Sequence, residues 1–165
     1  MRRCFLLTSV FCLLFVVGVP APARADLTGF VGINPTPVNR GVKGFAVGAG
    51  MLIVGFEAEY CDTSEDVVLA GPRLRTFMFN GLVQTPIPIA GMQFYGTAGG
   101  GGYREEFSTV VDSSETNVGT NIGGGAKISL AGPLRLRVDY RIFHLHGSPR
   151  HDTVQRFYAG INLKF

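Results

Sequence analysis

The stretch LRLRVDYRIFH, residues 134–144, alternates between two kinds of side chain. One set is apolar and holds every second position: Leu134, Leu136, Val138, Tyr140 and Ile142. The set between them is mostly charged: Arg135, Arg137, Asp139, Arg141 and Phe143. Because successive side chains of a β-strand point to opposite faces, a period of two predicts a strand with one apolar and one charged face.

The C-terminal stretch VQRFYAGINLKF, residues 154–165, repeats this alternation. Its apolar positions are Phe157, Ala159, Ile161, Leu163 and Phe165. Weaker alternation predicts six more strands, at residues 27–33, 44–51, 54–60, 71–79, 92–103 and 121–130. The chain holds 23 glycines, a density that disfavours long helices. The sequence therefore predicts an all-β chain of eight strands.

The predicted connections are of two kinds. Ala131-Gly132-Pro133 has the composition of a tight turn. Longer polar segments at 34–43, 61–67, 104–119 and 145–153 are expected to be exposed loops. Residues 80–90 form a further connector. A turn near residues 50–54 is inferred from the strand count alone, because that segment contains no typical turn residue beyond Gly50.

The N-terminus has the three parts of a secretory signal peptide. A basic start, Met1–Arg3, precedes an apolar run at residues 4–19, and an Ala-x-Ala site at Ala23 and Ala25 follows. We expect residues 1–25 to be removed and 26–165 to form one domain. The apolar run is short for a retained transmembrane helix, which needs about 20 residues.

Removal of this leader changes the charge balance. The chain has 15 Lys and Arg against 12 Asp and Glu, and three of the basic residues lie in the leader. The remaining domain is formally neutral, which gives no electrostatic reason to expect nucleic-acid binding. Cys4 and Cys12 also lie in the leader, so Cys61 has no intrachain disulfide partner.

Two architectures fit eight alternating strands in an exported chain. A soluble barrel turns its apolar face inward, whereas an outer-membrane barrel turns it toward lipid. Strands of about 11 residues match a tilted bilayer crossing. Phe157 and Phe165 lie roughly 20 Å apart along the membrane normal, close to the spacing of two aromatic girdles. Short and long connectors also alternate, as periplasmic turns and external loops do. A small secreted soluble barrel would often carry disulfides, and none is available here. Since a spanning sheet must close on itself, we expect an eight-stranded antiparallel up-and-down transmembrane β-barrel.

The segments TNIGGGAKISLAGPLRLRVDYRIF and RFYAGINLKF resemble the small OmpA/OmpX-like outer-membrane β-barrel family. The resemblance implies a monomeric barrel in the cell outer membrane, with both ends in the periplasm and with contacts to outer-membrane lipid and lipopolysaccharide. We expect no cofactor, and because no peptidoglycan-binding domain is expected after Phe165, tethering to the cell wall is not implied. It also implies that the last strand is read by the outer-membrane assembly machinery, through Phe157, Ile161, Leu163 and Phe165.

An apolar outer face would place eleven charged residues in the lumen. They are Glu57, Glu59, Arg73, Arg75, Lys127, Arg135, Arg137, Asp139, Arg141, Arg156 and Lys164. Buried charges need partners, so this set predicts a network of ion pairs that fills the interior. The excess of bases over acids supports a second hypothesis, a narrow anion-preferring channel.

The histidines His144, His146 and His151 cluster around the last loop. A His-x-His pair on one strand face could hold zinc or copper. The run also resembles the outer-membrane lipid A deacylase, but the position of its serine is occupied here by His146. Ser148 lies beyond Gly147, and no partnering Glu follows. We therefore expect no enzymatic activity and a structural or interaction role in the cell envelope.

Overall fold

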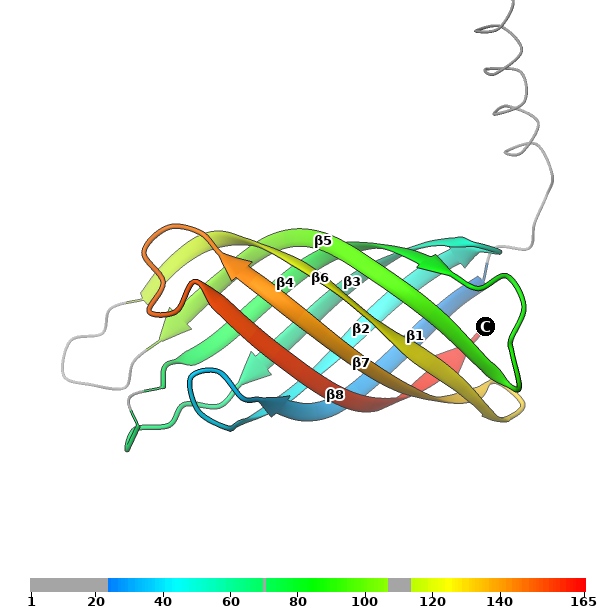
Figure 1. The fold of residues 1–165 in the computed structure, drawn as a ribbon, viewed down its shortest axis with the longest axis horizontal. Coiled ribbons are helices and arrows are strands. Elements are labelled where there is room, and N and C mark those ends of the chain that lie inside the picture. The colour runs from blue at the N-terminus through cyan, green and yellow to red at the C-terminus, as the bar shows by residue number, and fades with distance from the viewer. Residues whose placement is uncertain (1–23, 70, 107–113) are drawn as a thin grey trace, which may run out of the picture.

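The computed structural model describes residues 24–69, 71–106 and 114–165. They form eight antiparallel strands that close into one barrel (Figure 1). The strands are β1 (Arg24–Asn34), β2 (Arg40–Met51), β3 (Val54–Thr63), β4 (Arg73–Gln84), β5 (Met92–Glu106), β6 (Ser114–Ala131), β7 (Leu134–Leu145) and β8 (Thr153–Lys164). No helix in these ranges is long and apolar enough to cross a bilayer. The predicted fold class, an all-β chain of eight strands in an up-and-down barrel, is confirmed.

The last strand closes the barrel against the first. β8 pairs with β1 in an antiparallel ladder that runs from Ile33 opposite Phe157 to Asp26 opposite Lys164. Beyond it, the amide of Phe165 donates a hydrogen bond of 2.8 Å to the carbonyl of Ala25. Ala25, the predicted cleavage position, and Arg24 before it are part of β1, whereas residues 1–23, with Ala23, lie outside the described residues.

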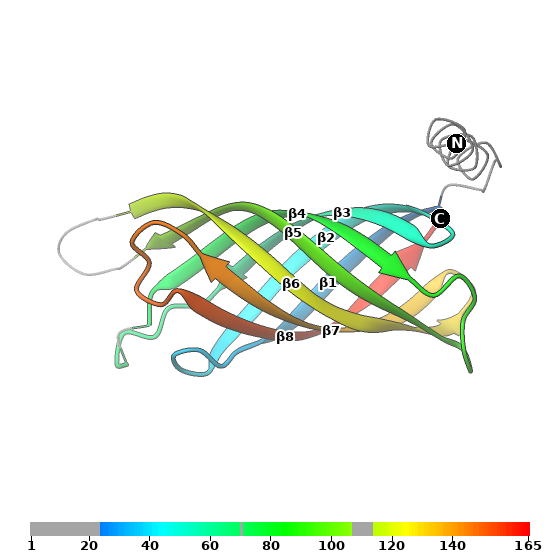
Figure 2. The same ribbon diagram turned by 45° about the horizontal axis from the view of Figure 1, so that its top comes forward.

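The two ends of the barrel differ in their connections (Figures 1 and 2). At the turn end, β2–β3 and β6–β7 are joined by two residues each and β4–β5 by residues 85–91, beside the C-terminus. At the opposite loop end, residues 35–39 join β1 to β2, residues 64–72 join β3 to β4, and residues 146–152 join β7 to β8. The turn inferred between the second and third strands is confirmed, and Leu52 adopts a left-handed φ of 40° there. Glycine or asparagine usually supplies that conformation, so a leucine at this position carries no turn signal.

The strands extend beyond the predicted segments. β4 continues to Gln84 through the predicted connector, and β5 and β6 extend to Glu106 and from Ser114. The loops between them are correspondingly shorter, except before β4, which begins at Arg73, two residues later than predicted. The reason is that alternation in hydropathy reports only the part of a strand whose two faces differ in polarity.

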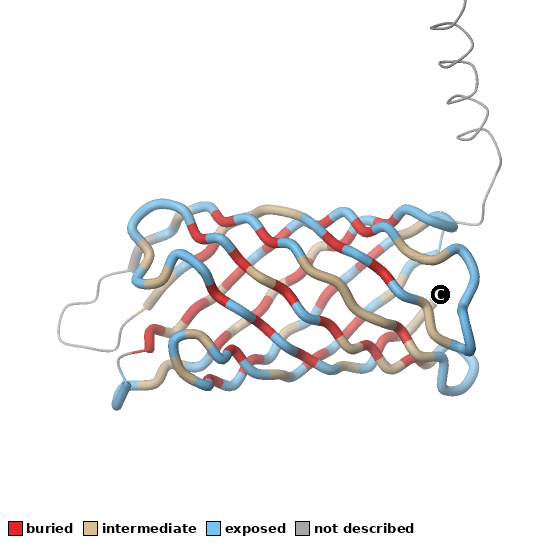
Figure 3. Tube along the Cα trace, viewed as in Figure 1, coloured by how far each residue is buried: buried red, intermediate tan, exposed pale blue. Residues whose placement is uncertain are grey.

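Burial alternates along each strand (Figure 3). The outer face is largely apolar and exposed, as at Phe56, which is 70% exposed, and Val31, which is 68% exposed. The lumen contains two apolar clusters. One lies toward the loop end and consists of Leu74, Met78, Tyr103, Phe143, Leu145 and Val154. The other consists of Phe30, Val42, Ala46, Cys61 and Tyr158.

Candidate functional site

Six charged side chains meet in the middle of the lumen. β3, β7 and β8 contribute them, and β3 and β7 are four strands apart on opposite walls of the barrel. We call this set the lumen network: Glu57, Glu59, Arg137, Asp139, Arg141 and Arg156. All six residues are buried, with at most 3% of any residue exposed. The strand alternation explains this arrangement, because every second position of β3 and β7 points inward.

The arginines of β7 connect the two walls. The guanidinium of Arg137 donates to both carboxylate oxygens of Glu57, and its Nη2 lies 3.1 Å from Oδ2 of Asp139. Arg141 places Nη2 at 2.8 Å from Oε1 of Glu57 and Nε at 2.9 Å from Oδ1 of Asp139. Its Nη1 lies 3.2 Å from Oε2 of Glu59. Each arginine thus bridges carboxylates on β3 and β7.

Two tyrosines complete the coordination of the carboxylates. Tyr158 donates its hydroxyl to Oε2 of Glu59 at 3.1 Å, and Arg156 contacts the other oxygen of Glu59 at 3.0 Å. The Tyr95 hydroxyl donates to Oδ2 of Asp139. Neither tyrosine was predicted to belong to the network, although both lie on the non-apolar face of their strands.

Charges within the lumen network balance, with three carboxylates against three guanidinium groups. An isolated buried charge is costly, and the cost falls when the charge is paired and hydrogen-bonded. The expected excess of bases over acids is therefore absent at the centre of the barrel.

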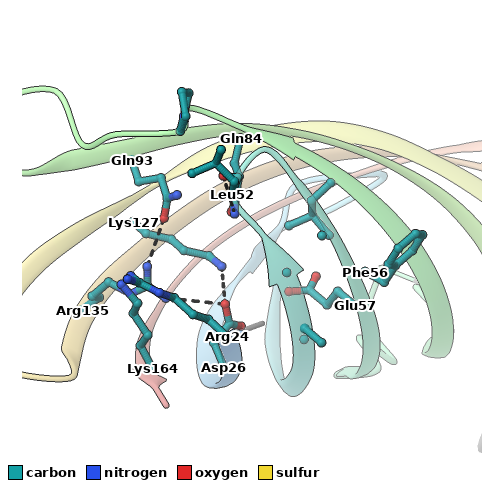
Figure 4. A pocket seen from close by; sticks show the side chains of 16 residues that line it. Arg24, Asp26, Leu52, Phe56, Glu57, Gln84, Gln93, Lys127, Arg135 and Lys164 are labelled. Carbon is teal, nitrogen blue, oxygen red and sulfur yellow. Dashed lines mark hydrogen bonds and ion pairs between the residues drawn. The ribbon is translucent and has the colours of Figure 1, made fainter. Parts of the chain in front are cut away.

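Four other basic residues line a pocket of about 140 Å³ at the turn end (Figure 4): Arg24, Lys127, Arg135 and Lys164. Arg40, also buried, lies at the loop end, where it donates to the carbonyl of Thr36 at 2.9 Å. Lys127 places Nζ at 2.6 Å from Oδ2 of Asp26, and Arg135 places Nη2 at 3.5 Å from the same oxygen. Arg135 also donates to Asn162 at 2.9 Å. Asp26 was missed because it precedes the first predicted strand.

Arg73 and Arg75 are not part of the lumen, and their predicted placement is wrong. On β4 the inward positions are held by Leu74, Thr76 and Met78, all at most 1% exposed. Arg73 and Arg75 point outward at the loop end and pair with Asp62 and Glu106. The physical reason is that, at this end of the strand, the apolar residues fill the barrel and the charged residues face out.

The histidines do not converge on one site. His144, near the end of β7, is exposed, and its Nδ1 lies 3.3 Å from Oγ1 of Thr153. β7 ends at Leu145, so His146 is the first residue of the following loop. Among the described residues, no group of three or more His, Cys, Asp or Glu side chains is arranged to hold a metal. Ser148 is exposed in the loop.

The C-terminal residues predicted as an assembly signal share one face. Phe157, Ile161 and Phe165 are exposed on the outer surface of the barrel, and Leu163 is partly exposed on the same face. These four side chains therefore form an apolar edge beside the seam between β8 and β1.

No family model matches the chain, and no curated protein matches it. Solved structures share the fold. The N-terminal β-barrel domain of OprF from Pseudomonas aeruginosa is 14% identical, with a TM-score of 0.67, over 86% of this chain and 97% of that one. Neisserial surface protein A is 14% identical, with a TM-score of 0.66, over 87% and 96%. The outer-membrane enzyme PagL is 16% identical, with a TM-score of 0.54, over 84% and 98%. The chain is thus similar in fold to small outer-membrane β-barrels.

Proposed function

We propose that this protein is an integral outer-membrane barrel of the OmpA/OmpX-like kind, with a closed lumen and a structural or interaction role in the cell envelope. The observation that carries the proposal is the charge-balanced lumen network, together with the apolar cluster on its loop-end side. A water path would need wetted, unpaired groups along its length, and the side chains of Arg137, Arg141 and Arg156 are fully buried instead.

Orientation follows from the family resemblance and from the alternating connections. The turn end and both termini would face the periplasm, and the loop end would face outward. Phe157, Ile161, Leu163 and Phe165 would then be presented to the assembly machinery on the periplasmic side. The protein would act as a monomer through its loops and outer wall, in contact with outer-membrane lipid and lipopolysaccharide.

Planar-bilayer recording of the purified, refolded protein tests the closed lumen. We expect no discrete conductance steps, with the heat-denatured protein as the matched negative control. Discrete steps would contradict the closed lumen. Membrane fractionation and heat-modifiable gel migration test the location, and a water-soluble, monodisperse chain 26–165 would contradict it.

A second candidate function, a narrow anion-preferring channel, is favoured by one observation. Four basic side chains line the pocket at the turn end, against the two carboxylates of Asp26 and Glu57. Glu57 of the lumen network lines this pocket, and conduction would require the network beyond it to rearrange. Anion-selective steps in the bilayer recording would support this function over the first.

We also propose that the protein is not an enzyme. The alternative is hydrolysis of lipid A, a reaction for which His144 would have to act as the base and Ser148 as the nucleophile. Mass analysis of lipid A after incubation with the wild type and with His144→Ala tests it. A deacylated product from the wild type alone would overturn the proposal.

A further inference from the structure

All charged side chains described on the outer face of the strands lie in one region. They are at or near the loop end of β2, β3, β4 and β5, and we call them the outer charged patch: Lys43, Asp62, Arg73, Arg75, Arg104 and Glu106. The outward positions of β1, β7 and β8, and the described ones of β6, hold only uncharged residues and His144. The patch therefore covers one side of the barrel only.

The strand register places four of these residues in a single row. Lys43 is directly opposite Asp62, Asp62 is opposite Arg75, and Arg75 is opposite Arg104. Neighbouring strands are about 4.8 Å apart, so the row extends roughly 14 Å across the wall. The other two members of the patch, Arg73 and Glu106, are opposite each other one step closer to the loops.

Cations exceed carboxylates in the patch, four to two. Arg73 takes both oxygens of Asp62, with Nη2 at 2.5 Å and Nε at 2.9 Å. Arg75 and Arg104 share a single oxygen of Glu106, at 3.0 Å and 3.3 Å. Like charges directly opposite on neighbouring strands are unfavourable, and low-dielectric surroundings increase the repulsion. An added anion beside Arg75 and Arg104 would remove that repulsion.

An aromatic row lies next to the charged row, on the side toward the middle of the barrel. Phe45 is opposite Tyr60, and Tyr60 is opposite Phe77, two residues further toward the middle of the barrel. The rings of Phe45 and Tyr60 have centroids 5.7 Å apart. The wall thus changes from cationic to aromatic over about 7 Å. This polarity profile matches an amphiphile that lies along the barrel wall. Its anionic head group would contact the cationic row, and its acyl chains would contact the aromatic row.

We propose that the outer charged patch binds the phosphate groups of a phosphorylated, acylated glycolipid of the outer leaflet, the lipid A part of lipopolysaccharide. Arg75 and Arg104 hold the phosphate, because the planar guanidinium group matches phosphate geometry with two parallel hydrogen bonds. Lys43 adds charge at the other end of the row, and Phe45 and Phe77 contact the acyl chains. This inference rests on the proposed function, since it requires the loop end to lie in the outer leaflet.

Native mass spectrometry of the detergent-solubilised full barrel tests the site. The probe is bisphosphorylated lipid A, compared with the same lipid after phosphatase treatment. We expect the wild type to retain one lipid A, and Arg75→Gln/Arg104→Gln to bind it at least about tenfold more weakly. Lys164→Gln removes a charge at the turn end and is the matched control, with unchanged binding. Equal binding by the double variant, or equal binding of the dephosphorylated lipid, overturns the proposal.

A conservative variant separates recognition from folding. Arg75→Lys/Arg104→Lys keeps both charges but loses the paired hydrogen bonds, so we expect weaker binding than wild type and stronger binding than the Gln variant. If the Gln variant does not fold, as judged by heat-modifiable migration, the Lys variant decides alone, and unchanged lipid affinity then overturns the proposal. A protein that fractionates outside the outer membrane would refute the proposed function instead, before any lipid is added.

Discussion

Arg141 is the residue on which most of the lumen network depends. Its guanidinium contacts Glu57, Glu59 and Asp139 within 3.2 Å. Arg141→Met would leave these buried carboxylates short of a partner, and breaking a buried ion pair in this way costs about 3–5 kcal/mol. Urea unfolding of the barrel in lipid vesicles should therefore shift strongly to lower urea. Lys164→Met, at the edge of the turn-end pocket, should change stability by less than about 1 kcal/mol, and an equal effect of both would contradict this reasoning.

The charged residues show what sequence reasoning can and cannot determine at this scale. The inward position of Arg137, Asp139 and Arg141 follows from alternation with apolar neighbours along one strand. Their partners do not follow, because Glu57 is 80 residues away from Arg137 in the chain. Only the closed barrel brings opposite walls within reach of one side chain.

At the scale of a strand, β4 shows where the prediction went wrong. Arg73 and Arg75 share a face with Phe77 and Phe79, which are both exposed on the outside. The predicted segment ended at residue 79, and its outer face was assigned to Leu74, Thr76 and Met78. These residues instead point into the lumen, so the inner face was mistaken for the outer one. A strand that passes from an apolar band into a polar interface reverses its polarity pattern, and periodicity alone does not reveal that reversal.

Close approach of β6 to its neighbours gives a second test. A methyl group at Gly125 would lie 2.1 Å from the carbonyl oxygen of Val138 and 2.6 Å from the hydroxyl of Tyr95. We expect Gly125→Ala to destabilise the barrel by about 1–3 kcal/mol, as overpacking does. Gly29→Ala is the control, because nothing lies within 4 Å of its added methyl group. The urea midpoints of the two variants provide the comparison, and a midpoint for Gly125→Ala as high as the control's would count against the packing argument.

The last strand should affect assembly more than final structure. Deletion of Phe165 removes one hydrogen bond, to Ala25, and one outward aromatic side chain. We expect the yield of inserted barrel in cells to fall, while refolding in vitro gives the same far-ultraviolet circular dichroism. Unchanged insertion in cells would exclude a role for Phe165 as an assembly signal.

For the whole molecule, orientation in the membrane is the property to test. Val68, in the β3–β4 loop, is 91% exposed, and Leu52, in the β2–β3 turn, is 60% exposed at the opposite end. In a Cys61→Ser background, we expect Val68→Cys to react with a membrane-impermeant maleimide on intact cells. Leu52→Cys should react only after the outer membrane is permeabilised, and the reverse pattern would invert the proposed orientation.

Cys61 has a further consequence for experiments on this barrel. It is the only cysteine after residue 25, and it lies fully buried on the lumen side of β3, beside Ala46 and Tyr158. A buried thiol reacts with an alkylating reagent only when the structure around it opens. The rate of Cys61 alkylation in the wild-type chain therefore measures how often two strands separate. Cys61 should therefore be alkylated faster in Arg141→Met than in Lys164→Met.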